Sequence, residues 1–205
     1  MITIIDYGLG NLGSIKNMFK KIGVDALITN NHSEINAATK LILPGVGAFD
    51  NGVSNLKQFG LIDLLNKKVL QEKTPILGIC LGMQLMTKNS EEGMLPGLGW
   101  IDSETVKFKF DNTAKKYTIP HMGWAFVSAI KSSKLFNGMY VNPRFYFVHS
   151  YYVKCNQTSD TLLQTNYSHD FVSGFEKDNI IGVQFHPEKS HKYGMLLLKN
   201  FIELY

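Results

Sequence analysis

Short apolar runs alternate with helical patterns through the first 90 residues of the chain, and this alternation constrains the fold most. The apolar runs cover residues 2–6, 25–29, 40–45 and 75–79. Strands with so few polar residues predict a parallel sheet covered on both faces, because a strand with one wet face alternates polar and apolar side chains. Helical patterns that can supply this cover occupy residues 11–23, a short segment from Ser33, 54–73 and 81–89.

The second half of the chain changes character, because strand-like runs follow one another with short polar connections. These runs are residues 104–110, 124–130, 144–154, 161–167 and 179–185, and a helical pattern over 193–205 closes the chain. Such a succession favours an antiparallel extension of the sheet or a flanking β-sheet. The sequence therefore predicts an α/β three-layer sandwich with a central, mostly parallel mixed sheet, built as one domain over residues 1–205.

Composition and charge exclude several classes of protein. Of the 205 residues 44% are apolar and 19% are charged, and the net charge is only +4. The lysines form small scattered clusters, which indicates solvated faces rather than a nucleic-acid footprint, although a mildly basic patch can face an acidic partner. The chain opens on a strand-like MITIID without a signal-peptide pattern, and no apolar run approaches the roughly 18 residues of a membrane span. Two cysteines without a C-x-x-C spacing favour a reducing compartment, so we expect a cytoplasmic protein.

A glycine motif near the N-terminus suggests a dinucleotide cofactor. Gly8, Gly10 and Gly13 have the spacing G-x-G-x-x-G between a strand and a helix. A dinucleotide fold also needs an acidic residue about 20 positions later, at the end of the second strand. That strand ends on Asn30 and Asn31. We therefore expect no cofactor and interpret the glycines as a tight turn.

Cys80 lies at the centre of a more specific motif. Residues 78–82 spell G-x-C-x-G between a buried strand and a helix, which is the cysteine form of a nucleophile elbow. The turn needs small neighbours, and the start of the helix favours the thiolate and offers backbone N–H groups, including that of Leu81, to an oxyanion. The alternative is a small buried core cysteine. Cys155 lies in no comparable setting.

His186 and Glu188 supply a base and a group to orient it. They follow an apolar strand two positions apart, with Pro187 between them. Residues i and i+2 of an extended chain project to one side, so the carboxylate can reach the imidazole. The order Cys80, His186, Glu188 fits a Cys-His-Glu triad. A surface histidine paired with a nearby glutamate is the alternative, and a metal site is disfavoured because no H-x-x-x-H spacing exists.

These motifs carry a resemblance to a family. GICLGMQL and QFHPE resemble the class I, triad-type glutamine amidotransferases, whose fold is a flavodoxin-like core with an antiparallel β extension. IDYGLGNLGS, LILPGVGAF, PHMGW, YFVHSY and QFHPEKS make the whole chain similar to the glutaminase subunits of imidazole glycerol phosphate synthase. The resemblance implies hydrolysis of glutamine to glutamate and ammonia, with Cys80 as nucleophile, His186 as base and Glu188 as its orienting group.

The resemblance also implies residues that bind substrate and partner. Those that would hold glutamine or its oxyanion are Gly45, Val46, Gly47, Leu81, Gln84, His149, Ser150 and Tyr151. For His149 and Tyr151, packing against the sheet is an alternative role. The ammonia would pass to a (β/α)8-barrel cyclase subunit in a heterodimer, and the residues that would face it are Gly10, Asn11, His121, Met122, Trp124 and Lys189. No metal is implied.

Three residues depart from the pattern of these subunits. Gly13 stands where an arginine is common, Ala125 where asparagine is usual, and His191 where a small residue is commoner. All three fall near the expected partner face, and they fit a paralogue that supplies ammonia to a sugar amidination step in surface-polysaccharide synthesis. A partner-independent thiol hydrolase of γ-glutamyl bonds and a non-catalytic binding domain are the alternatives of a different class.

Overall fold

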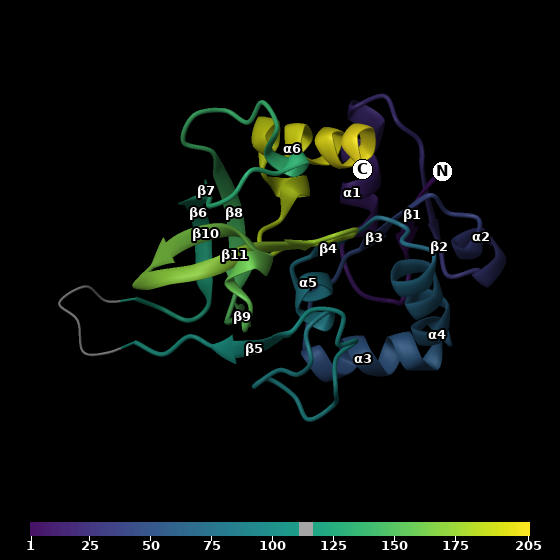
Figure 1. The fold of residues 1–205 in the computed structure, drawn as a ribbon, viewed down its shortest axis with the longest axis horizontal. Coiled ribbons are helices and arrows are strands. Elements are labelled where there is room, and N and C mark those ends of the chain that lie inside the picture. The colour runs from purple at the N-terminus through teal and green to yellow at the C-terminus, as the bar shows by residue number, and fades with distance from the viewer. Residues whose placement is uncertain (111–116) are drawn as a thin grey trace.

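A five-stranded parallel sheet forms the centre of the molecule (Figure 1). The computed structural model describes residues 1–110 and 117–205. The parallel strands, in spatial order, are β2 (Ala26–Thr29), β1 (Ile2–Ile5), β3 (Lys40–Leu43), β4 (Ile76–Ile79) and β12 (Ile180–Val183). All but β2 are wholly or almost wholly buried, as the apolar runs predict.

Antiparallel strands extend this sheet beyond β12. The extension contains β11 (His169–Lys177), β10 (Thr161–Tyr167), β7 (Ser128–Ala129), β9 (Tyr151–Cys155) and β5 (Ser103–Lys107). A separate two-stranded sheet joins β6 (His121–Phe126) to β8 (Arg144–His149). The predicted mixed, mostly parallel α/β sheet is therefore confirmed, and it has both an extension and a flanking sheet.

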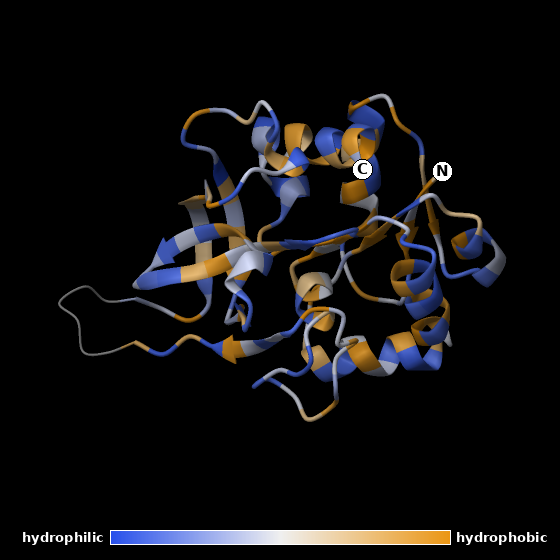
Figure 2. Cartoon of the chain, in the orientation of Figure 1, coloured by the Kyte–Doolittle hydropathy of each residue, from blue (hydrophilic) through white to orange (hydrophobic). Residues whose placement is uncertain are grey.

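Helices cover the two faces of the parallel sheet. Helices α1 (Leu12–Lys21) and α6 (His191–Leu204) pack together on one face. The other face carries α2 (His32–Asn36), α3 (Phe49–Gln58), α4 (Leu61–Asn66) and α5 (Leu81–Leu85). Figure 2 shows the apolar colour concentrated on the central strands and on the helix sides that face them. Two hydrophobic clusters result, one on each side of the sheet.

The remaining elements are short, and no membrane-spanning helix is present among the residues described. A π-helical turn covers Lys67–Gln71, and 3-10 turns cover Lys134–Phe136, Thr158–Asp160 and Pro187–Lys189. Within the described ranges, none of the helices is long and apolar enough to cross a membrane.

Three local expectations were wrong. The helix predicted over 54–73 breaks at Gly60, which adopts a φ of 66°. The strand predicted over 144–154 divides at Ser150 into β8 and β9, which belong to different sheets. Strand β11 was not predicted, because Gly174 and flanking charged residues obscure its alternation. A Cβ at Gly174 would lie 2.7 Å from the side chain of Leu163 on β10, so close strand packing requires this glycine.

Candidate active site

Cys80 occupies a sharp turn between β4 and α5. Its φ of 53° and ψ of −110° lie where side-chain-bearing residues are strained, as expected of a nucleophile elbow. The two glycines of the motif, Gly78 and Gly82, are required because a side chain at either position would collide with the backbone. A Cβ at Gly82 would lie 1.7 Å from the carbonyl oxygen of Leu43, and one at Gly78 would lie 2.8 Å from the backbone nitrogen of Met83.

His186 and Glu188 lie beside this elbow because β12 pairs with β4. The backbone N–H of Cys80 donates to the carbonyl of Val183 at 2.9 Å, so the two chain segments leave the sheet together. His186 Nδ1 lies 2.8 Å from Glu188 Oε1, and their side chains are 2% and 3% exposed. Glu188 reaches the imidazole from the turn Pro187–Lys189, not from an extended chain as the sequence suggested.

The proton-binding state of His186 is set by its neighbours. Burial lowers the pKa of His186, but the nearby Cys80 and Glu188 side chains, which favour the charged imidazolium, raise it more, and the net shift is upward. Nε2 is buried and has no hydrogen-bond partner among the described residues. This nitrogen is therefore free to accept or give a proton next to the sulfur.

A cavity of about 310 Å³ opens over Cys80. Its lining consists of Val46, Gly47, Cys80, Leu81, Gln84, Glu92, Pro120, Val148, His149, Ser150 and Tyr151. The structure thus brings together the predicted substrate residues except Gly45, which is buried behind the lining. A larger hollow of about 800 Å³ lies between α3, α4 and residues 95–98 and does not include Cys80.

The loop over residues 44–47 closes one side of this cavity. The N–H of Leu81, a predicted oxyanion donor, donates to the carbonyl of Gly45 at 3.3 Å. The hydroxyl of buried Tyr7 donates to the Pro44 carbonyl at 2.5 Å, and a Cβ on Gly45 would lie 2.3 Å from that hydroxyl. In this conformation the Leu81 N–H is occupied, so it does not point freely at a substrate oxyanion.

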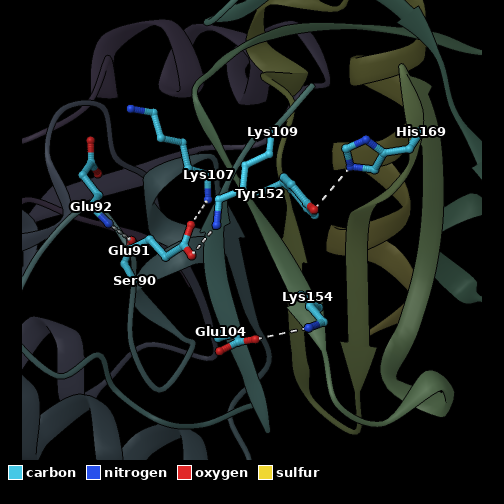
Figure 3. A network of polar contacts seen from close by, with 9 residues as sticks. All are labelled: Ser90, Glu91, Glu92, Glu104, Lys107, Lys109, Tyr152, Lys154 and His169. Atoms are coloured by element: carbon cyan, nitrogen blue, oxygen red, sulfur yellow. Dashed lines mark hydrogen bonds and ion pairs between the residues drawn. The ribbon is translucent and has the colours of Figure 1, made fainter. Parts of the chain in front are cut away.

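Glu92 is a cavity residue that sequence reasoning missed, because it belongs to no spaced motif. Its Oε2 accepts from the N–H of Phe49 at the start of α3 at 2.9 Å, and burial raises its pKa. Its own N–H donates to Ser90 Oγ at 3.1 Å. The neighbouring Glu91 accepts from the backbone N–H of Lys107 at 2.7 Å and from Lys109 Nζ at 3.2 Å, as Figure 3 shows. These contacts hold the turn that carries Glu92.

The residues predicted to face a partner fall into two groups. Met122 and Trp124 on β6 are 62% and 44% exposed, and Lys189 is exposed with its Nζ 5.6 Å from the ring centroid of Tyr146. In the turn after β1, Gly10 is half-buried against Pro44, and Asn11 is exposed and caps α1 by accepting from the N–H of Ser14.

His121 differs from this expectation, since it is 3% exposed and its side chain points inward. Its Nδ1 lies 3.0 Å from His149 Nε2. Burial lowers the pKa of His121 to about 4 and that of His149 to about 3. Both imidazoles are therefore neutral at pH 7. Across the described part of the chain, no group of three or more His, Cys, Asp or Glu side chains could hold a metal ion.

Comparison with known proteins identifies the family to which this chain belongs. The family model for glutamine amidotransferase class-I matches residues 3–204, and the chain belongs to this family. Two solved structures share the fold. One is a glutamine amidotransferase with a TM-score of 0.74 at 16% identity, over 100% of this chain and 98% of that one. The other is a glutamine amidotransferase from Thermotoga maritima, with a TM-score of 0.64 at 20% identity over 100% and 81%.

Curated relatives show which members of the family this chain closely resembles in sequence. Imidazole glycerol phosphate synthase subunit HisH 2 of Methanococcus maripaludis is 62% identical over 99% of both chains. HisH 2 of Pseudomonas aeruginosa is 48% identical, and HisH of Leptospira interrogans is 43% identical, each over the full length of both chains. Within the class I glutamine amidotransferases, the chain belongs with these HisH subunits.

Proposed function

We propose that this chain is the glutaminase subunit of an imidazole glycerol phosphate synthase, and that Cys80, His186 and Glu188 are its catalytic triad. The observation that carries the proposal is the buried His186–Glu188 pair beside a cysteine held at positive φ, in a chain of this family. A strained nucleophile, a base with a free nitrogen and a carboxylate that orients the base are the parts that acyl transfer needs.

The cavity residues suggest how glutamine would be held. Glu92 offers a carboxylate to the α-ammonium group, and Gln84 belongs to the same lining. Ser150 and Tyr151 belong to the cavity lining, and this side of the cavity would receive the α-carboxylate end. A ligand held at both charged ends places its side-chain amide toward Cys80.

The reaction then follows from the positions of the proton carriers. The Cys80 thiolate attacks the amide carbonyl carbon, and the C–N bond breaks as His186 Nε2 gives its proton to the leaving ammonia. The glutamyl thioester that remains is attacked by water, whose proton passes to His186. The carbon–sulfur bond breaks and glutamate leaves, so glutamine and water become glutamate and ammonia.

The loop at residues 44–47 would have to change before the first step. The Gly45 carbonyl now accepts the Leu81 N–H, and rotation of the Gly45–Val46 peptide would free that donor and turn the N–H of Val46 toward the substrate. Gly47, with a φ of 116° and open space where a Cβ would stand, can absorb the rotation. A closed oxyanion hole would keep the isolated subunit slow until a partner opens it.

The partner would be a (β/α)8-barrel cyclase subunit that receives the ammonia and forms imidazole glycerol phosphate and AICAR in histidine biosynthesis. The subunit names of the relatives support this heterodimer, and the exposed Met122, Trp124 and Lys189 offer an apolar and basic surface for it. We place this complex in the cytoplasm.

A second candidate differs only in the ammonia acceptor. The atypical His191 stacks on Trp124 with ring centroids 5.4 Å apart and planes 5° apart, so the departure from the common pattern lies on the proposed docking surface. Two of the named relatives also carry the number 2, as in an organism with more than one such subunit. A paralogue that supplies ammonia to sugar amidination in polysaccharide synthesis would have such an altered surface.

Reconstitution separates these candidates. Glutamate release is measured for the chain alone, with a cyclase of the histidine pathway and with the sugar-pathway synthase, each with its acceptor substrate. Stimulation by the cyclase, abolished by Cys80→Ala, is expected. Stimulation only by the synthase would transfer the assignment to the paralogue. Efficient partner-free cleavage of γ-glutamyl peptides, or turnover unchanged in Cys80→Ala, would overturn both.

A further inference from the structure

Gln184 is a buried polar residue that the proposed triad does not use. It follows β12, two residues before His186, and its side chain is fully buried. Its Nε2 lies 3.7 Å from Cys80 Sγ, and its Oε1 lies 3.0 Å from Gln84 Nε2. Gln184 therefore links the nucleophile to a residue of the cavity wall.

The orientation of the Gln184 amide is decided by a backbone carbonyl. Amide oxygen and nitrogen are interchangeable by shape, so their assignment needs an unambiguous neighbour. The carbonyl oxygen of Tyr151 can only accept, and Gln84 Nε2 lies 3.1 Å from it. The Gln84 amide group thus has its NH₂ toward Tyr151, and the second hydrogen of that NH₂ meets Gln184 Oε1. If the Gln184 amide were turned by 180°, its NH₂ group would face the NH₂ group of Gln84. The NH₂ group of Gln184 must therefore face the sulfur.

The same carbonyl also fixes two histidines. His149 Nδ1 lies 2.7 Å from the Tyr151 oxygen and must carry the proton, which leaves Nε2 as an acceptor. His121 Nδ1, 3.0 Å away, donates to it. Burial favours the neutral form of both rings, which this arrangement requires. Hydrogen bonds therefore connect β6 to Cys80 through the Tyr151 carbonyl, which accepts from His149 on one side and from Gln84 on the other.

We propose that Gln184 donates a hydrogen bond to the Cys80 sulfur and stabilises its thiolate, and that Gln84 and the Tyr151 carbonyl orient Gln184 for this role. A donor to an anionic acceptor stabilises the charged form more than the neutral one. The same N–H stays beside the sulfur when the thiolate is regenerated at the end of the cycle. The proposal uses the thiol chemistry of the proposed glutaminase but does not depend on the identity of its substrate.

Several ionisable groups lie near Cys80, and a test of Gln184 must leave them unchanged. His186 and its partner Glu188 come from the segment after β12, and Tyr7 comes from the segment after β1. Glu92 and His149 lie in the same cavity lining. Substitution of Gln184, which is uncharged, leaves all five in place.

The test measures alkylation of Cys80 by iodoacetamide against pH, with peptide mass spectrometry to separate it from Cys155. In Gln184→Leu, we expect the pH profile of Cys80 to move upward by about one unit, which is a roughly tenfold slower reaction below the midpoint. Gln184→Glu keeps the shape and places a carboxylate at the sulfur, so its shift should be at least as large. This variant also carries the test if the leucine variant fails to fold.

Two controls define the outcome. Cys155 in the same samples and Cys80 in Gln164→Leu, a substitution on β10 away from the site, should keep their profiles. Unchanged Cys80 profiles in both Gln184 variants would overturn the proposal. Glutamine turnover with the barrel partner is assayed separately. If the alkylation profile shifts but the protein does not hydrolyse glutamine, the proposed function would be wrong. The proposed role of Gln184 would still be supported.

Discussion

The Nδ1 atom of His186 lies 2.8 Å from Glu188 Oε1, and both side chains are shielded from water. Glu188 is one of the two groups that raise the pKa of His186 against the effect of burial. In a Glu188→Gln variant this pKa should fall, because an amide cannot stabilise the imidazolium as a carboxylate does.

In the proposed mechanism, activity should be lost at high pH, when His186 loses the proton that it would give to ammonia. The alkaline limb of kcat/KM for glutamine should therefore move to lower pH in Glu188→Gln, and kcat should fall about 10²–10⁴-fold. Glu203→Gln, which removes an exposed carboxylate 3.9 Å from Lys199, is the matched control and should leave both unchanged. An alkaline limb that does not move would show that Glu188 does not act through His186.

Glu92 provides a test of substrate binding that is separate from the chemistry. Glu92→Gln should raise KM for glutamine about 30-fold or more, because the ammonium group would lose a partly buried charge partner worth about 2 kcal/mol or more. The alkylation rate of Cys80 by iodoacetamide should change little, since that reagent carries no ammonium group. Glu104→Gln, which breaks an exposed 3.5 Å pair with Lys154 seen in Figure 3, is the control. A KM equal to that of the control would exclude Glu92 from binding.

The His121–His149 pair predicts a specific pH dependence of stability. Burial lowers the pKa of His121 to about 4 and that of His149 to about 3, whereas an unfolded histidine binds its proton near pH 6.5. The unfolded state then binds more protons, so the free energy of unfolding should decrease as the pH falls from about 6.5 toward 4.

Urea unfolding between pH 7.5 and 5 measures this effect. His121→Phe removes one titrating group and should show a shallower decrease than the wild type, even if it is less stable at every pH. His32→Phe, at an exposed histidine, serves as the control. Equal slopes for wild type and His121→Phe would contradict the prediction.

Two glycines that look alike in the sequence should respond in opposite ways to alanine. Gly13 lies in α1 with nothing within 4 Å of where a Cβ would stand, so Gly13→Ala should stabilise the protein by about 1 kcal/mol through helix propensity. Gly82→Ala would place Cβ 1.7 Å from the Leu43 carbonyl oxygen and should cost about 3 kcal/mol or more. Thermal melts of the two variants decide this, and a stable Gly82→Ala protein would contradict the packing of the elbow.

Local patterns were sufficient to predict the elbow and the pairing of His186 with Glu188. Both depend on residues close together in the chain: the glycines of 78–82 specify a turn, and a two-residue separation limits where a carboxylate can lie. The turn geometry at Glu188 still differed from the extended form, because Pro187 begins a 3-10 turn. The two-residue spacing thus predicted the contact between His186 and Glu188, but it did not predict the backbone conformation that makes this contact.

The sequence by itself determined the α/β class, the buried parallel strands and the candidate nucleophile with its base, since periodicity and turn residues are local properties. Tertiary structure alone decided that β12 lies beside β4, which brings residues 80 and 186 to one edge of the sheet. It also placed Glu92 in the cavity, turned His121 inward and put Gln184 against the sulfur. Gln184 and Cys80 are 104 residues apart in the chain. No local sequence pattern encodes which distant polar groups will form hydrogen bonds with one another once both are buried.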